Sequence, residues 1–82
     1  VGGEPILSHS INLRTIESEI ANSLSKVQNE NMDVEIGSYP FFKAGKLGVS
    51  IVIRSEKQSK IDNCVKHIVK FVNEKKIEII KR

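Results

Sequence analysis

The chain contains little of the chemistry that metalloproteins and most enzymes need. Among its 82 residues there is one cysteine, there are two histidines, and tryptophan is absent. One cysteine cannot close an internal disulfide, and so few cysteines and histidines do not make a zinc site. No apolar run approaches the roughly 18 residues of a membrane-spanning helix, and the first residues lack the pattern of a signal peptide. We therefore expect a cytoplasmic protein with no metal, no cofactor and no membrane partner.

Length and composition predict one small globular domain. Hydrophobic residues make up 39% and charged residues 28% of the chain, which is typical of a folded, soluble protein. Residues 1–5 are expected to be a linker or an expression remnant, and residues 6–82 the domain itself. A catalytic pocket of about 300 Å³ or more would consume much of so small a core. The size therefore favours a binding, regulatory or accessory module over an enzyme acting alone.

Apolar and polar residues alternate in four short segments, as they do in half-buried strands. These predicted strands span residues 6–13, a segment from Met32, residues 47–54 and residues 77–80. The second strand is expected to end at Tyr39-Pro40, because proline lacks the amide hydrogen that a strand ladder needs. Residues 41–46 are then expected to form a loop.

Two other segments carry apolar residues at helical spacing. The first predicted helix spans residues 15–28, with Thr15 as its N-cap. The second occupies residues 60–74, where seven apolar residues fall within an arc of about 160°: Phe71, Cys64, Ile68, Ile61, Val72, Val65 and Val69. Ser55 with Gln58, or Ser59 with Asp62, would make a capping box for this helix.

The predicted order is strand, helix, strand, strand, helix, strand. Two split strand-helix-strand units with right-handed crossovers make a four-stranded antiparallel sheet with both helices on one face. The expected fold is the ferredoxin-like α+β two-layer sandwich. The open face of the sheet is expected to be mostly polar, with these residues: Ser8, Ser10, Asn12, Glu35, Tyr39, Ser50, Val52, Arg54 and Glu78.

The reactive residue types do not form a site. Cys64 lies in the middle of the apolar arc, so we expect a buried structural cysteine rather than a reactive thiolate. His9 and His67 have no partner at ligand or triad spacing. Residues 45–48 spell the glycine clamp of a KH module, but they lead into a strand rather than joining two helices. We therefore expect no catalytic and no metal-binding residue in this chain.

The segment from Tyr39 to Phe42 stands out, because three of the four aromatic residues of the chain lie within it. One interpretation is that Tyr39, Phe41 and Phe42 cap the open end of the core. The other is that Tyr39, Pro40, Phe41 and Phe42 form an apolar surface that docks on a neighbouring domain or on a second copy. We call these four residues the aromatic segment.

Charge is unevenly divided along the chain. Residues 1–42 hold two basic residues against six acidic ones, whereas residues 43–82 hold eleven against four. Such a basic half suggests an alternative function, a nucleic-acid or nucleotide-binding module. Its anion-binding residues would lie on the second helix and just before it: Lys57, Lys60, Lys66 and Lys70. The strand over residues 47–54 has no aromatic side chain on which a base could stack, which argues against nucleic acid.

The aromatic segment also carries a family resemblance. A strand that ends in Ile-Gly-Ser-Tyr-Pro (residues 36–40), preceded by a helix that begins near residues 17–21, resembles a segment found in two related families. In the competence/damage-inducible protein CinA and in eukaryotic FAD synthases, this segment follows the molybdopterin-binding-like (MoCF) domain. His9-Ser10 and the strand over residues 48–54 also match, and the resemblance is nearer to the FAD synthases. It extends from about His9 to Ile80.

The resemblance implies an accessory domain rather than a catalytic one. In these families the preceding domain carries nucleotide-pyrophosphate chemistry with a metal, and in FAD synthases a further domain adenylates FMN. The motifs of both domains are absent from this chain, so no catalytic or cofactor-binding position is carried over. We expect the parent protein to be a nucleotide pyrophosphatase or an FAD synthase. The expected partners of this domain are the other domains of the parent, or a second copy in a homo-oligomer.

Overall fold

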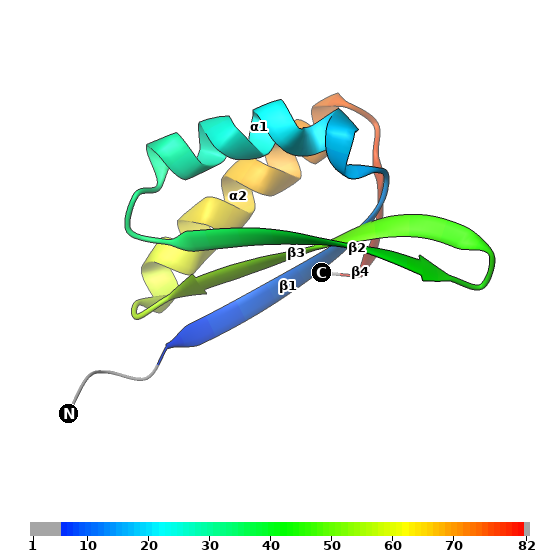
Figure 1. The fold of residues 1–82 in the computed structure, drawn as a ribbon. Helices are drawn as coiled ribbons and strands as arrows, with labels where there is room; N and C mark the ends of the chain where they lie inside the picture. The colour runs from blue at the N-terminus through cyan, green and yellow to red at the C-terminus, as the bar shows by residue number, and fades with distance from the viewer. Residues whose placement is uncertain (1–5, 82) are drawn as a thin grey trace.

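A computed structural model describes residues 6–81; the predicted linker over residues 1–5 lies outside the described residues. The elements follow the predicted order: β1 (Leu7–Arg14), α1 (Glu17–Glu30), β2 (Glu35–Lys43), β3 (Lys46–Ser55), α2 (Gln58–Glu74) and β4 (Glu78–Lys81). The strands form one antiparallel sheet in the spatial order β2-β3-β1-β4. Both helices lie on the same face of this sheet (Figure 1). The fold is the predicted ferredoxin-like α+β sandwich.

The core lies between the sheet and the helices. In the two central strands, Ile11 pairs with Ile51 and Leu13 pairs with Val49, and all four side chains are fully buried. The helices cover them with an apolar arc whose most buried members are Ile20 of α1 and, on α2, Ile61, Cys64, Ile68 and Val72. Each of the isoleucine, leucine and valine side chains among them contributes about 1.5–3 kcal/mol by leaving water. The predicted helical arcs are thus confirmed as the faces that build the core.

A small polar network joins the end of α1 to α2. The side-chain amide of Asn31 donates to the carbonyl oxygen of Val27 at 2.8 Å and lies 3.0 Å from Nδ1 of His67. Asn63 donates to the side-chain oxygen of Asn31 at 3.0 Å. Asn31 is buried, and a buried polar group left unpaired costs about 1–3 kcal/mol. The network therefore fixes how the helices meet, and it gives His67 a packing role.

The predicted end of the second strand is wrong. Strand β2 begins at Glu35, after an exposed Met32, and continues through Pro40 to Lys43. A two-residue turn at Ala44 and Gly45, both with positive φ, then leads directly into β3. Because β2 is an edge strand, its proline is tolerated where the missing amide hydrogen would point away from the sheet. Residues 41–46 are therefore a hairpin rather than a loop.

The predicted helix caps are also wrong. Helix α1 begins after Ile16, and the hydroxyl of Thr15 donates to Oε2 of Glu19 at 2.9 Å instead of accepting from the backbone. Helix α2 begins after Lys57, and neither helix has a side-chain cap hydrogen bond. Ser55 instead stabilises the connection between β3 and α2, because its hydroxyl accepts from the backbone N–H of Lys57 at 3.3 Å. Within residues 6–81, no helix has the length and apolarity that crossing a membrane requires.

Candidate interaction surface

The β2-β3 hairpin extends beyond the N-terminal end of α1 and forms an overhang (Figure 1). The aromatic segment lies in the part of β2 that leads into this overhang. Successive side chains of a strand point to opposite faces of a sheet. Pro40 and Phe42 pair with Val49 and Leu47 and share the face on which the helices pack. Tyr39 and Phe41 lie on the open face. The four aromatic-segment residues are therefore divided between two faces and do not form one patch.

The largest apolar exposure on the overhang belongs to Phe42 and Leu47. These residues are direct cross-strand partners, and their side chains are 69% and 57% exposed. Partners on one face of an antiparallel pair have Cβ atoms about 4.5–5.5 Å apart, so the two side chains lie side by side. We call Phe42 and Leu47 the tip pair. The sequence pattern does not indicate Leu47 as a surface residue, because its alternation with Val49 and Ile51 is that of a core strand.

Phe41 belongs to the packing of the hairpin itself. Its partner across the hairpin is Gly48, and a Cβ atom at this position would lie 2.7 Å from Cε1 of Phe41 and 2.9 Å from the carbonyl oxygen of Leu13. The glycine thus lets the ring lie directly on the backbone of β3. Phe41 is half-buried as a result. It is less available to a partner than Phe42.

Tyr39 packs along its own strand in a similar way. A Cβ atom at Gly37 would come within 2.8 Å of the Tyr39 hydroxyl oxygen, so the ring of Tyr39 lies over this glycine. The ring is still 57% exposed. Gly37 allows a close approach to the backbone, and the group that makes this approach is the ring of Tyr39, two residues further along the same strand. Tyr39 and Phe41 are therefore two aromatic side chains at the β2 edge of an open face that is otherwise mostly polar.

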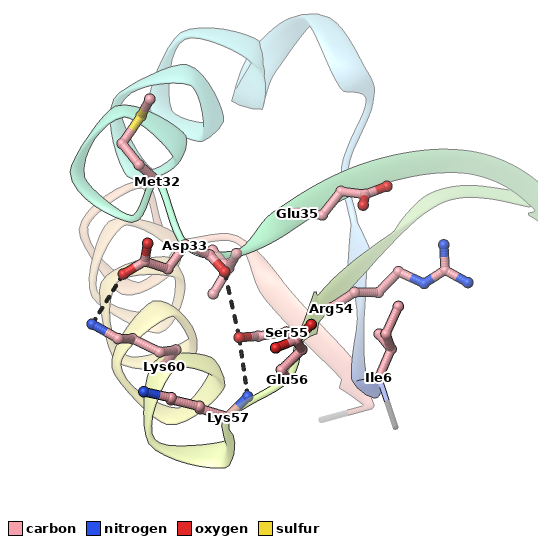
Figure 2. Close-up of a pocket in the computed structure, with 10 residues that line it drawn as sticks. Ile6, Met32, Asp33, Glu35, Arg54, Ser55, Glu56, Lys57 and Lys60 are labelled. Atoms are coloured by element: carbon pink, nitrogen blue, oxygen red, sulfur yellow. Dashed lines mark hydrogen bonds and ion pairs between the residues drawn. The ribbon is translucent and has the colours of Figure 1, made fainter. Parts of the chain in front are cut away.

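The four lysines of the alternative anion site do not gather in one place. Lys57 and Lys60 line a hollow of about 520 Å³ at the opposite end of the sheet, together with Asp33, Glu35 and Glu56 (Figure 2). Nζ of Lys60 lies 3.1 Å from Oδ2 of Asp33, so this charge is already paired.

Lys66 and Lys70 lie further along α2, on its exposed surface. A helical step of about 100° per residue turns Lys66 about 120° away from Lys60. The lysine set is thus split in two, and carboxylates stand beside one part. Both features weaken the case for a single polyanion site.

The described residues contain no metal-binding cluster. Within residues 6–81, no three His, Cys, Asp or Glu side chains lie together in a way that would hold an ion. Cys64 is buried, and its burial raises the pKa of the thiol to about 11. Because the thiolate is the nucleophilic form, this cysteine is not activated at neutral pH. The prediction of a buried structural cysteine is confirmed.

The fold and the surface define a class of protein: a small ferredoxin-like α+β domain with an aliphatic core and an apolar hairpin tip outside it. A family model described as "FAD synthase, middle domain" matches residues 5–81. The chain belongs to this family, which confirms the resemblance to FAD synthases that the sequence around residues 36–40 indicates. No curated protein and no solved structure matches the chain.

Proposed function

We propose that this chain is a non-catalytic accessory domain of an FAD synthase-like protein, and that the tip of its β2-β3 hairpin is a protein contact surface. The observation that carries the proposal is the tip pair, two large apolar side chains held side by side outside the helix cover. Single exposed apolar residues are normal, whereas neighbouring ones on a protruding element are typical of contact sites. The docking partner is another domain of the parent or a second copy of this chain.

The family name supports this placement, because a middle domain has neighbours in the parent protein. Covering Phe42 and Leu47 would contribute roughly 1.5–3 kcal/mol for each side chain. That energy is modest against the entropic cost of free association. It is sufficient between parts of one molecule or assembly, where the effective concentration is high. The adenylating and pyrophosphatase chemistry of the parent would then reside in its other domains.

The proposal is tested by amide hydrogen exchange on the isolated chain and on the full-length parent. We expect the backbone amides of the hairpin tip to exchange at least about tenfold more slowly in the parent, because docking covers them. The double variant Phe42→Ser, Leu47→Ser should remove this difference. It should leave the isolated domain folded, since both side chains are exposed.

The matched control is the double variant Ile6→Ser, Met32→Ser. These side chains are 68% and 77% exposed and lie at the opposite end of the sheet. The control should retain the protection of the hairpin tip in the full-length protein. Equal exchange of the tip in the isolated chain, kept at a concentration at which it is monomeric, and in the parent would rule the docking role out.

A further inference from the structure

Strand β4 covers only one end of β1. On one side β1 pairs with β3 from Leu7 to Leu13, whereas on the other side β4 pairs only with residues 12–14. Within residues 6–81, no strand lies beside residues 7–11 on the β4 side. We call this stretch the open edge of β1. An uncovered strand edge is a template for pairing with another strand.

The hairpin turn determines which backbone groups point to the open edge. A two-residue turn with positive φ makes Lys43 and Lys46 a hydrogen-bonded pair, and such pairs recur at every second residue. On β3 the even-numbered residues therefore bond to β2, and the odd-numbered residues bond to β1. The latter pair with odd-numbered residues of β1. The N–H and C=O groups of Ser8 and Ser10 thus point the other way, toward the open edge.

The edges of β2 and β1 differ in their capacity to accept a further strand. By the same alternation Pro40 stands at an outward position of β2. It has no amide hydrogen to donate, and its ring obstructs a strand that would pair there. Ser8 and Ser10 are exposed and carry neither obstacle. The open edge of β1 is therefore the one that is suited to pairing.

Half-buried apolar side chains flank the open edge on the helix face. Leu7 packs against the core from β1 and remains half-buried, as do Val65 and Val69 of α2. A helical step of about 100° places both valines about 160° from His67, which lies 3.0 Å from Asn31 at the end of α1. Because α1 lies over β2, the valines lie on the opposite side of α2, toward the β4 edge of the sheet. A strand beside β1 would cover them.

We propose that in the parent protein the chain that follows this domain extends β4 along the open edge of β1. The inference concerns a surface other than the hairpin tip, and it rests on the family, because a middle domain is followed by further chain. Asn12 pairs with Lys81 in an antiparallel ladder, so each further residue reaches one residue back along β1. The four residues that follow Arg82 then pair, in order, with Ser10, His9, Ser8 and Leu7.

This register satisfies both the backbone and the side chains of the open edge. The first and third of the four residues exchange backbone hydrogen bonds with Ser10 and Ser8. The second and fourth direct their side chains to the helix face, where Val65 and Val69 are half-buried. The polar open face receives the other two side chains. The segment that fills the edge is therefore an extended strand with alternating polar and apolar residues.

The position of β4 favours this segment over a second copy. Strand β4 already lies beside β1 and runs along it toward the open edge, so its extension needs no turn and no connection. The pairing is intramolecular, so its effective concentration is high. A strand from a second copy would instead meet Lys81, which already stands opposite Asn12.

Amide hydrogen exchange resolved to single residues tests the proposal on the full-length parent and on the 82-residue chain, kept monomeric. We expect the amides of Ser8 and Ser10 to exchange about tenfold or more slowly in the parent. The amide of His9 points to β3 and should be protected in both chains, which reports an intact sheet. Equal exchange of Ser8 and Ser10 in the two chains would overturn the proposal.

A proline variant tests whether the protection arises at this edge. Ser10→Pro places a ring where the added strand would lie, so the Ser8 amide in the parent should return to its rate in the 82-residue chain. The domain should stay folded, because an outward position accepts proline, as Pro40 shows on β2. The matched control is Ser38→Pro, the same change at an outward position of β2. Protection of Ser8 that survives Ser10→Pro, or that is lost in Ser38→Pro as well, would overturn the proposal.

A disulfide identifies the segment and its register. Residues in a hydrogen-bonded antiparallel pair have Cα atoms about 5.5 Å apart, within the range that a disulfide spans. Ser10→Cys should therefore cross-link, within one parent molecule, to a cysteine introduced at the first residue after Arg82. The native Cys64 does not compete, because it is buried and its thiol pKa is about 11. The control places the introduced cysteine one residue later, where its side chain takes the opposite face. No cross-link, or equal yields from both positions, would overturn the register.

The register also predicts the sequence of the parent beyond this chain. The second and fourth residues after Arg82 should be apolar, and the first and third must each donate an amide hydrogen to β1. A proline at the first or third position would overturn the proposal. None of these outcomes involves the hairpin tip, so docking of the tip and extension of β4 fail on different measurements.

Discussion

Val49 and Leu47 lie two residues apart on the same strand and point to the same face of the sheet, yet Val49 is fully buried and Leu47 is 57% exposed. The side chains differ little in hydrophobicity. Val49 belongs to the core cluster, whereas Leu47 is the second residue of β3, next to the turn of the hairpin that extends beyond α1 (Figure 1). Strand alternation therefore determines which face a residue takes, and the extent of the helices determines whether that face is covered.

The covered half of the hairpin and its overhang therefore have different roles. In the covered half, apolar residues stabilise the fold against unfolding. In the overhang, apolar residues of the same kind contribute little to the fold and remain available to a partner. A domain this small has limited apolar surface to bury. The two large apolar side chains outside its core are therefore a substantial fraction of the apolar surface that it could bury.

The largest expected effect comes from truncating a side chain in the covered half. Ile51→Ala should lower the free energy of unfolding by about 2–5 kcal/mol, because it removes a fully buried side chain and leaves a cavity. Leu47→Ala on the same strand should change it by less than about 0.5 kcal/mol. Urea unfolding followed by circular dichroism measures both. Comparable losses for the two variants would show that the overhang is packed and would break the comparison.

A smaller effect is expected at the boundary between the two halves, where Phe41 lies on Gly48. Gly48→Ala should cost about 1–3 kcal/mol, because the added Cβ meets the Phe41 ring and the Leu13 carbonyl oxygen. In a Phe41→Ala background this cost should fall by at least about 0.5 kcal/mol, since one of the two obstacles is gone. Urea unfolding of the four chains of this double-mutant cycle measures the coupling.

Gly45→Ala is the matched control for that cycle. Gly45 has φ +76° and no atom within 4 Å of an added Cβ, so its substitution is costly through backbone conformation alone. Its cost should not depend on Phe41. Equal coupling at Gly45 and Gly48 would mean that Phe41 acts on the whole turn and not through contact with one glycine.

The sequence predicts the covered half better than the overhang. The order of the elements, the open face of the sheet and the buried Cys64 follow from alternation and from helical arcs, which are properties of short stretches. The end of β2 could not be predicted in this way. Whether Pro40 stops a strand depends on whether that strand lies at an edge, and the edge is defined by the spatial order β2-β3-β1-β4.

The same limit applies to the candidate site. The concentration of aromatic residues in 39–42 points to the correct segment, but an assumed loop after Pro40 conceals their division between two faces. Leu47 carries no signal of its own, because it has the spacing of a core residue. Its exposure depends on where the helices end above the sheet, which is a property of the packed fold and not of the local pattern.

The smallest expected effect comes from the ionisation of one buried group, the thiol of Cys64, compared with a thiol on the overhang. Burial raises the pKa of the Cys64 thiol from 9.0 to about 11, so between these values the folded chain keeps a proton that the unfolded chain has lost. The free energy of unfolding should therefore fall as the pH rises, by about 1 kcal/mol between pH 8 and pH 10 from this group. The quantity to measure is the difference in pH slope between the native chain and Cys64→Ala, because this difference isolates the contribution of the Cys64 thiol. Moving the thiol to the overhang as Leu47→Cys in the Cys64→Ala background should not restore the steeper slope, since an exposed thiol ionises alike in both states. A restored slope would mean that the overhang is covered, and identical slopes for the native chain and Cys64→Ala would mean that Cys64 is not shielded from water.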